Sequence, residues 1–312
     1  MAPMPSPPLL LSIVGPTATG KTSLALRLAE HLDSEIVNAD ALQVYRGLDI
    51  GTAKPSREER SRVPHHLVDI LEPTERFSAG DFARLARTAI SEIHDRDRAA
   101  LVVGGSGFYL KALFEGLSPL PRAQPEVRAQ LKRRAEEEGP EILHAELAEL
   151  DPETAARLPR GDTQRIVRAL EVAVASGRPL SAWIADNPAP SRPLSALHVG
   201  LTLPRAILYD RISVRVDRMV ERGWLEEVRG LLAMGIPPEA PAFQAIGYRQ
   251  MVRCIRGELP LDEAIDETVR ATRRFAKRQM TWFRKESQVN WFDPRSLGED
   301  MSDILRLLEQ SG

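Results

Sequence analysis

Residues 9–32 read LLLSIVGPTATGKTSLALRLAEHL, and this stretch decides the fold of the chain. The apolar run at 9–14 is far shorter than the roughly 20 residues of a membrane-spanning helix, and it predicts a buried strand. Residues 15–22 follow the pattern G-x-x-x-x-G-K-T, and apolar residues recur at helical spacing through 24–32. A strand, a glycine loop and a helix in this order predict a phosphate-binding loop.

The loop offers backbone N–H groups and a cation to a phosphate group. Its glycines let successive N–H groups point inward, and the start of the following helix adds partial positive charge. We expect Lys21 to neutralise the terminal phosphates and the Thr22 hydroxyl to hold Mg²⁺. The predicted diphosphate- or nucleotide-binding residues are Gly15, Pro16, Thr17, Ala18, Thr19, Gly20, Lys21 and Thr22.

Further strands and helices alternate along the chain. Apolar runs at 35–38, 99–103 and 198–203 predict strands, and the spacing at 79–93 predicts a helix. This alternation predicts an α/β fold, in which a parallel sheet is flanked by helices and ligands bind at the carboxyl ends of the strands. Asp40 is the only carboxylate at the end of a predicted core strand.

The pattern changes between 119 and 193, where charged helical segments follow one another without a strand-like run. We therefore predict an inserted all-helical domain at 119–193, which divides a catalytic core into a first part at 1–118 and a second part at 194–312. The second part carries helical segments at 207–233, 244–256 and 261–283, and a weak amphipathic helix follows Pro294.

Composition narrows the class of protein. A length of 312 residues suggests roughly two domains, and a net charge of −2 predicts no global attraction to nucleic acid. The first eight residues lack the basic start of a signal peptide. The single cysteine, Cys254, fits a reducing compartment, so we expect a cytoplasmic protein without a membrane segment; Cys254 itself is expected to be a small buried apolar residue.

A strongly basic segment stands out against this neutral background. Residues 268–287 hold seven basic residues against Glu286 alone, a local charge of +6. On a helix, four of them share one face, namely Arg270, Arg274, Lys277 and Arg278, while Val269, Thr272, Ala276, Met280 and Phe283 line another. Backbone phosphates of a nucleic acid are the natural partner of such a face.

These residues leave three functions open. An RNA-modifying transferase uses both the phosphate loop and the basic helix. A small-molecule kinase that uses ATP needs only the loop, and a non-catalytic RNA-binding protein needs only the helix. The strand at 99–103 ends in Gly104 and Gly105 where mechanical nucleotide hydrolases carry a magnesium-binding Asp, which favours a small transferase.

Several further segments resemble one family. They are NADALQVYRGLDIGTAKP at 38–55, PHHLVD at 64–69, VGGSGFYLK at 103–111, QRIVRALE at 164–171, AIGYRQ at 245–250 and AKRQMTWFR at 276–284. With the phosphate loop, they resemble tRNA dimethylallyltransferase, also called tRNA isopentenyltransferase, along about 9–292. The likeness is to the shorter bacterial form, which lacks the zinc finger appended in some eukaryotic relatives.

This resemblance implies a reaction and a fold. Members transfer a dimethylallyl group from dimethylallyl diphosphate to N6 of adenosine 37, beside the tRNA anticodon, giving N6-(dimethylallyl)adenosine and diphosphate. The phosphate loop then holds the allylic diphosphate in a core related to P-loop kinases. The helical insertion grips the anticodon stem, and we expect a monomer that uses Mg²⁺.

The chemistry assigns a base. The lone pair of an adenine exocyclic amine is delocalised into the ring, so the reaction needs a good leaving group and removal of the N6 proton. Asp40, at a strand end beside the phosphate loop, is the predicted base. A role for Asp40 as a magnesium ligand or a cap is the alternative, and the two roles are compatible.

Negative charge develops on the diphosphate as the allylic C–O bond breaks, and cations and donors near it lower the barrier. Lys21, Thr22 with Mg²⁺, and Ser106 have suitable side chains; the family usually has Thr where this chain has Ser106. By resemblance, Arg215 is the further cation that reaches the diphosphate.

The adenine must leave its stack to reach such a pocket. Gln and Arg side chains read base edges, and the resemblance places three segments and one insertion residue against the RNA. Thr163 stands where the family usually has Pro. The predicted tRNA-binding residues are Asp40, Ala41, Leu42, Gln43, Ser106, Arg128, Gln164, Arg165, Ile166, Val167, Arg168, Gln244, Gly247, Tyr248, Arg249, Gln250, Lys277 and Arg278.

Overall fold

The computed structural model describes residues 9–122, 124–189, 193–286, 288–298 and 301–311. The chain divides into two compact units, one of Met1–Phe114 with Leu194–Gly312 and one of Glu115–Pro193. We call them the core unit and the inserted unit. The predicted boundary at 119 lies inside the inserted unit, and the amino-terminal residues 1–8 lie outside the described part of the chain.

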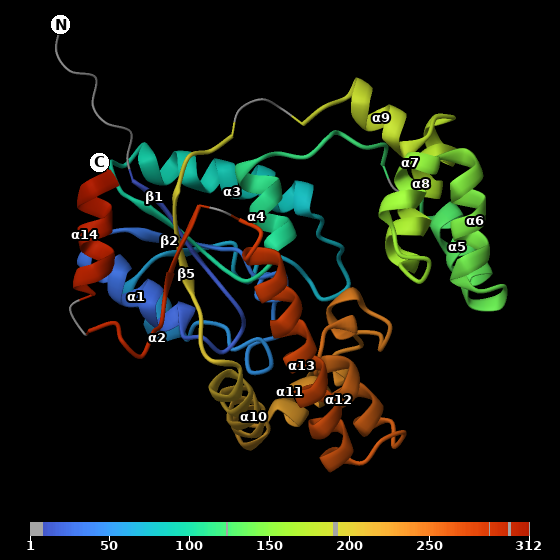
Figure 1. The fold of residues 1–312 in the computed structure, drawn as a ribbon. Coiled ribbons are helices and arrows are strands. Elements are labelled where there is room, and N and C mark those ends of the chain that lie inside the picture. Colours follow the sequence, from blue (N-terminus) through green and yellow to red (C-terminus); the bar gives the residue numbers. More distant parts are fainter. Residues whose placement is uncertain (1–8, 123, 190–192, 287, 299–300, 312) are drawn as a thin grey trace, which may run out of the picture. The chain divides into compact units, whose positions relative to one another are not determined.

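A six-stranded parallel sheet forms the centre of the core unit, in the order β3-β2-β4-β1-β5-β6 (Figure 1). This confirms the predicted α/β class. The sequence does not predict β6, a short edge strand that follows the basic helix. The strands are β1 (Leu10–Val14), β2 (Glu35–Asn38), β3 (His65–His66), β4 (Ala100–Val103), β5 (Leu197–Leu201) and β6 (Val289–Phe292).

Helices cover both faces of the sheet. Leu11 and Ile13 of β1 pack in one apolar cluster with Leu24 and Leu28 of α1 (Lys21–His31) and with Ile304 of α14 (Ser302–Ser311). On the opposite face, α3 (Ala79–His94) contacts β2 and β4 and packs against α4 (Gly107–Phe114) (Figure 1). A short helix, α2 (Arg57–Arg62), precedes β3. Because helices cover both faces of the sheet, the carboxyl ends of the strands and the loops after them are left for a binding site.

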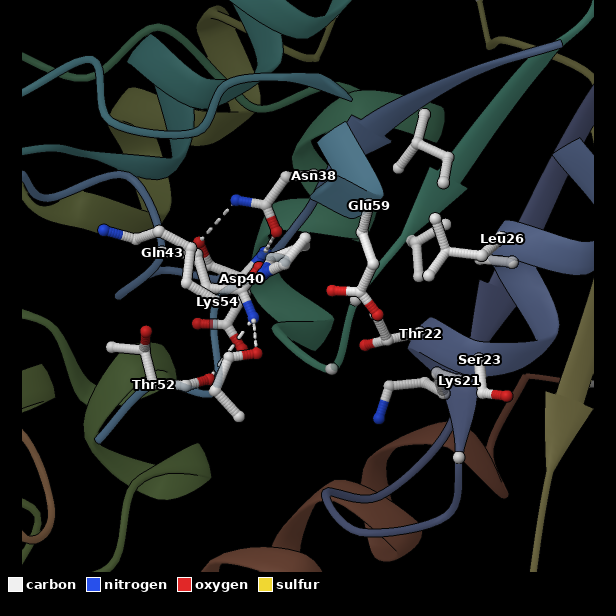
Figure 2. A pocket seen from close by; sticks show the side chains of 18 of the residues that line it. Lys21, Thr22, Ser23, Leu26, Asn38, Asp40, Gln43, Thr52, Lys54 and Glu59 are labelled. Carbon is white, nitrogen blue, oxygen red and sulfur yellow. Dashed lines mark hydrogen bonds between the residues drawn. The ribbon is translucent and has the colours of Figure 1, made fainter. Parts of the chain in front are cut away.

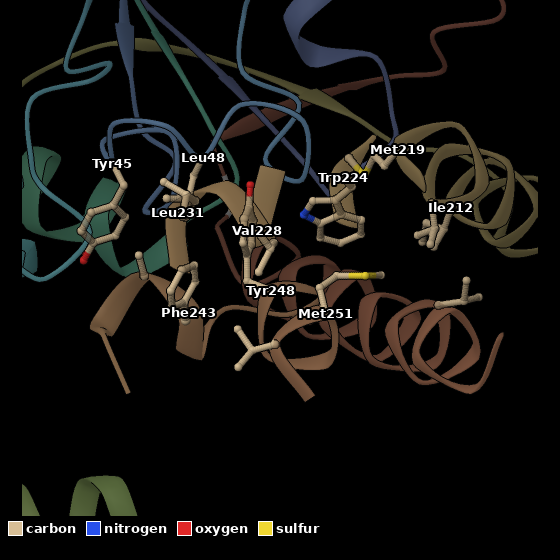
Figure 3. Packing of buried hydrophobic residues seen from close by; sticks show 14 of the residues in the cluster. Tyr45, Leu48, Ile212, Met219, Trp224, Val228, Leu231, Phe243, Tyr248 and Met251 are labelled. Carbon is tan, nitrogen blue, oxygen red and sulfur yellow. The ribbon is translucent and has the colours of Figure 1, made fainter. Parts of the chain in front are cut away.

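A helical layer follows β5 in the core unit. Its apolar cluster gathers around Trp224, Phe243, Tyr248 and Met251, and the loop after β2 adds Leu48 to it (Figure 3). This packing anchors the loop that begins at the end of β2. The elements of the layer are α10 (Arg205–Glu221), α11 (Trp224–Ala233), the 3₁₀ helix η1 (Pro241–Gln244), α12 (Tyr248–Ile255) and α13 (Leu261–Phe283).

All regular secondary structure in the described part of the inserted unit is helical. Three of its helices begin with proline, which suits the first turn because it has no N–H to leave unpaired. The unit has its own apolar core, which includes Leu131, Leu143, Leu147 and Leu170. Its helices are α5 (Pro125–Glu137), α6 (Pro140–Leu150), α7 (Pro152–Arg157), α8 (Thr163–Ser176) and α9 (Leu180–Asp186).

Candidate active site

A cavity of about 550 Å³ lies in the core unit where β1, β2 and β4 end. The phosphate loop, the loop after β2 and helices α10 and α13 all line it. Figure 2 shows Lys21 and Thr22 at one side of this cavity and Asp40, Gln43 and Lys54 at the other, with Glu59 between the two groups. The carboxyl edge of the sheet therefore gathers several of the predicted site residues, as parallel sheets do, although Ser106 does not line the cavity.

The phosphate loop has the backbone its sequence requires. Gly15 has a φ of +135°, and a Cβ at this position would lie 2.4 Å from the carbonyl oxygen of Leu201, so no larger residue fits. The Thr19 hydroxyl donates to the carbonyl of Pro16 at 2.9 Å and is fully buried. Thr19 therefore shapes the loop from within, while Thr22 at the start of α1 lines the cavity.

Two cations face the cavity from different elements. The Lys21 ammonium donates to the carbonyl of Pro16 at 2.7 Å. Burial, and then repulsion by Arg215, lower the pKa of Lys21 to about 7, against an opposing effect of Asp40. The pKa of Arg215 is also lowered, because the effect of burial exceeds the opposing attraction of Asp40. A site that holds two partly desolvated cations together is prepared for a multiply charged anion.

Asp40 sits in a tight turn at the end of β2. Its Oδ1 accepts the N–H of Leu42 at 2.9 Å, and its own N–H donates to Oδ1 of Asn38 at 3.1 Å. The N–H of Ala41 donates to the Ser106 hydroxyl at 3.3 Å, which brings Ser106 next to this turn. Among the described residues, none forms a hydrogen bond with Oδ2 of Asp40, so this oxygen is available to a substrate.

The loop after β2 is held by a buried cation that sequence analysis missed. The Lys54 side chain is only 1% exposed, and its ammonium donates to Asp49 and Asp69 at 2.6 Å each and to the carbonyl of Tyr45 at 2.7 Å. Gln43 lies within this loop, and its amide donates to the carbonyl of Thr52 at 3.3 Å. A lysine within a Gly-rich segment carries no signal that separates it from a surface lysine.

A second anchor comes from α11. The carboxylate of Glu227 accepts the backbone N–H groups of Asp49 at 2.9 Å and Ile50 at 2.6 Å, and the Tyr248 hydroxyl at 2.7 Å. Tyr248, predicted to bind tRNA, is fully buried in this contact. It supports the loop from inside the core because its hydroxyl is already used. Sequence analysis missed Glu227, which lies in an ordinary amphipathic helix.

The predicted segment at 244–250 therefore divides between surface and core. Gln244 and Arg249 are exposed. Gly247 and Gln250 are buried, and the Gln250 amide oxygen accepts the N–H of Gly247 at 2.8 Å to cap α12. The exposed pair remains the predicted RNA contact of this segment, whereas Gly247, Tyr248 and Gln250 shape its turn.

Helix α13 presents its predicted basic face to solvent. Arg270, Arg274, Lys277 and Arg278 are all exposed. The opposite side of the helix buries Val269, Ala276 and Phe283, while Thr272 and Met280 are half-buried. Arg273 lies outside the basic face, since its guanidinium stacks 5.3 Å from the centre of the Tyr209 ring. Phe275 and Gln279 of α13 reach the cavity, and sequence analysis missed both.

The inserted unit keeps some of its predicted RNA contacts on the surface and buries others. Gln164 and Arg165 are exposed, with Arg165 beside the Asp162 cap of α8. Ile166 and Val167 stay predicted contacts of this segment, but their side chains are buried in the core of the unit. The remaining two, Arg128 and Arg168, are half-buried and pair with the fully buried carboxylate of Glu171 at 2.6 and 2.8 Å.

Three further observations concern Cys254, clusters of metal-ligating side chains and membrane-spanning helices. Cys254 is half-buried rather than buried, because α12 keeps one side toward solvent. No group of three or more His, Cys, Asp or Glu side chains in the described ranges could hold a metal ion. Over the same ranges, every helix is too short or too polar to cross a membrane.

Comparison with known proteins identifies the family. Residues 43–286 match the family model described as IPP transferase. A tRNA dimethylallyltransferase of Syntrophobacter fumaroxidans is 50% identical over 281 residues, which cover 90% of this chain and 82% of that enzyme. One from Geobacter metallireducens is 49% identical over 284 residues, covering 91% of this chain and 92% of that enzyme.

Solved structures agree with the sequence relatives. The crystal structure of a tRNA isopentenylpyrophosphate transferase from Bacillus halodurans has a TM-score of 0.71 at 40% identity, and the match covers 97% of this chain and 96% of that one. A eukaryotic dimethylallyltransferase acting on tRNA has a TM-score of 0.75 at 26% identity, covering 92% of this chain and 74% of that one. The resemblance read from the motifs is thus confirmed, and the chain belongs to the tRNA dimethylallyltransferase family.

Proposed function

We propose that this chain transfers a dimethylallyl group from dimethylallyl diphosphate to N6 of adenosine 37 of tRNA, beside the anticodon. One observation carries this assignment: Lys21, Arg215 and Asp40 line the same cavity, so an anion-binding end and an unoccupied carboxylate oxygen share one space. A kinase or hydrolase also needs the first feature. The second feature, combined with the exposed basic face of α13, favours transfer to an RNA amine.

The donor diphosphate binds at the phosphate loop. Backbone N–H groups at the start of α1 and the two cations offset its charge, and they do so more strongly as the allylic C1–O bond breaks. The Ser106 hydroxyl lies beside the turn of Asp40 and is a suitable donor to the leaving diphosphate. Lys21 and Arg215 thus act mainly in the transition state, when the leaving group gains negative charge.

Mg²⁺ fits the donor end of the cavity. The Thr22 hydroxyl lines the cavity and forms no hydrogen bond with any described residue, and hydroxyl and phosphate oxygens are ligands that Mg²⁺ accepts together with water. Thr22 would therefore hold the ion against the diphosphate, where it would supply further charge neutralisation. Asp40 lines the same cavity, and a contact with the ion through water would be compatible with its role as a base.

The acceptor adenine enters from the side of Asp40. The C1–O bond of the donor breaks, a bond forms between C1 and N6, and the N6 proton passes to Oδ2 of Asp40. Gln43, whose side chain is fixed by the carbonyl groups of Thr52 and Ala53, is positioned to contact the edge of the base. Phe275 lines the same cavity and offers an apolar surface.

The rest of the RNA contacts the exposed basic face of α13 and the inserted unit. Lys277 and Arg278 contact the backbone phosphates, and Gln164 and Arg165 contact the stem from α8. Ala41, Leu42, Gln244 and Arg249 lie near the entering nucleotide in this proposal. In this proposal the core unit and the inserted unit of a single chain each supply side chains to the RNA, so we propose a cytoplasmic monomer.

The test is a transfer assay with separate donors. Purified protein is incubated with Mg²⁺, labelled dimethylallyl diphosphate and unmodified tRNA, and the RNA is digested to nucleosides for mass analysis. We expect adenosine beside the anticodon to gain one dimethylallyl group. Absence of transfer by folded protein on intact tRNA, with phosphorylation of a small molecule from ATP instead, would contradict the proposal and support a kinase.

A further inference from the structure

The buried amide of Gln279 joins helix α13 to the two loops at the donor end of the cavity. Its Oε1 accepts the N–H of Thr17 in the phosphate loop at 2.9 Å, and its Nε2 donates to the carbonyl of Gly105 at 2.8 Å. The residue is only 7% exposed and lies more than 170 positions from either partner in the chain. The two loops follow β1 and β4, which pair in the sheet, and the Gln279 side chain attaches helix α13 directly to both loops.

The polarity of the link is specific to an amide. One partner is a donor and the other an acceptor, so a group with one oxygen and one N–H is required between them. The approach is also close, because a Cβ at Gly105 would lie 2.2 Å from Nε2 of Gln279. The glycine thus allows the amide to reach the backbone that leads directly into Ser106.

The same helix turns its other side to solvent. Arg278 precedes Gln279 in the chain and is exposed, as are the adjacent Lys277 and, one turn earlier, Arg274. These exposed side chains and the amide that contacts Thr17 and Gly105 belong to one continuous 23-residue helix. Helix α13 therefore carries the basic face on one side and, on the other, a direct contact with the phosphate loop.

We infer that Gln279 is a positioning residue that couples RNA binding on α13 to diphosphate binding at the phosphate loop. Bound RNA restrains α13, the amide then restrains the loop, and a restrained loop binds diphosphate at a lower entropic cost. By thermodynamic reciprocity, diphosphate must strengthen RNA binding by the same factor. The inference rests on the proposed function, since it takes both ligands to belong to one reaction.

Inorganic diphosphate is the probe, with Mg²⁺ held constant. Its affinity is measured by calorimetry with and without a saturating unmodified anticodon stem-loop. For the wild-type chain we expect RNA to raise the diphosphate affinity about 10-fold, within the usual range of coupling between sites. The Gln279→Met variant keeps the volume but loses both hydrogen bonds, and its coupling should fall to less than about 2-fold.

A second variant keeps the test informative if the first one unfolds. Gln279→Glu retains an acceptor for the N–H of Thr17 but places a carboxylate against the carbonyl of Gly105 and near the anion. We expect it to weaken diphosphate binding about 10-fold without RNA, and far-ultraviolet circular dichroism checks that the variant is folded. A residue that only fills space would not respond to this change of charge.

Thr281→Ala is the matched control. Thr281 lies on the same helix, is exposed, and donates only to the carbonyl of Lys277 at 3.0 Å, so its variant should retain wild-type coupling. Coupling that is absent from the wild type, or that persists in Gln279→Met, would overturn the inference. Transfer by the wild type, assayed in parallel, separates these results from a failure of the proposed function, in which no transfer would occur at all.

Discussion

Asp40 and Lys21 line one cavity although 19 peptide bonds separate them in the chain. The turn at the end of β2 uses one carboxylate oxygen of Asp40 to hold itself together and leaves the other exposed to the cavity. One oxygen keeps the residue in place while the other remains free to accept a proton.

A substitution at Asp40 can separate its structural role in the turn from its proposed role as a base. Asp40→Asn retains an oxygen for the N–H of Leu42 but cannot take up the N6 proton, so we expect turnover to fall about 100-fold or more with little change in tRNA affinity. Single-turnover transfer and filter binding measure the two quantities. Turnover within about 2-fold of wild type would remove Asp40 from the role of base.

Lys21 predicts a pH dependence of donor binding. Its pKa of about 7 in the free site means that the ammonium loses its proton as the pH rises above 7. Diphosphate binds the charged form and takes up a proton on binding, so its affinity should fall by up to about 10-fold per pH unit above 7.

Calorimetric titration with inorganic diphosphate between pH 7 and about 8.5, at fixed Mg²⁺, tests this dependence. The control is Lys21→Arg, because a guanidinium stays charged throughout the range and should give a flatter profile. Equal slopes for the two proteins would assign the effect to ionisation of the ligand instead.

At the scale of elements, the loop after β2 is rigid because side chains from other elements hold it. Lys54 ties it to itself and to Asp69, Glu227 of α11 holds its backbone, and Leu48 packs into the cluster around Trp224. Without these contacts a loop of polar residues and glycines would adopt many conformations, and Asp40 and Gln43 would not be held in one position. Its precision is therefore a property of the helical layer beneath it.

Helix α13 carries the prediction at this scale. Replacing both Arg274 and Arg278 with Gln removes two exposed charges without disturbing the buried side of the helix. If each contacts a phosphate, the slope of log affinity for tRNA against log salt should become shallower by about 2. Binding titrations at several salt concentrations give this slope, and Thr281→Ala provides the control on the same helix. An unchanged slope would place the RNA elsewhere.

At the scale of the whole molecule, the chain leaves the core unit and returns to it at one point. The N–H of Leu194 donates to the carbonyl of Phe114 at 3.0 Å, so the two ends of the excursion are adjacent within the core unit. The inserted unit has its own apolar core around Leu143 and Leu147. Each unit therefore has the internal packing that independent folding requires.

Removal of the inserted unit should separate donor binding from RNA binding. With Phe114 and Leu194 joined by a short Gly-Ser linker, we expect a folded core unit that binds inorganic diphosphate within about 3-fold of wild type. Its tRNA affinity should fall about 10-fold or more, because exposed basic side chains such as Arg133 and Arg165 are lost. Far-ultraviolet circular dichroism checks folding, and undiminished tRNA binding would contradict the proposed role of the insertion.

The parts of this protein that depend on local order were predictable from its sequence. The strand, glycine loop and helix at 9–32 indicated the phosphate loop, and the alternation of later strands and helices indicated the parallel sheet and placed Asp40 at a strand end. The basic face of α13 was equally readable, because it needs only helical spacing.

Only the tertiary structure decided which polar side chains support the site. Lys54, Glu227 and Gln279 look like surface residues in the sequence, yet each is held by partners from distant segments. Conversely, Tyr248, Ile166 and Val167 lie in motifs that suggest RNA contacts, but packing places them inside. Burial and long-range hydrogen bonds depend on how the elements pack together, and this packing produces no periodic pattern in the sequence of any single element.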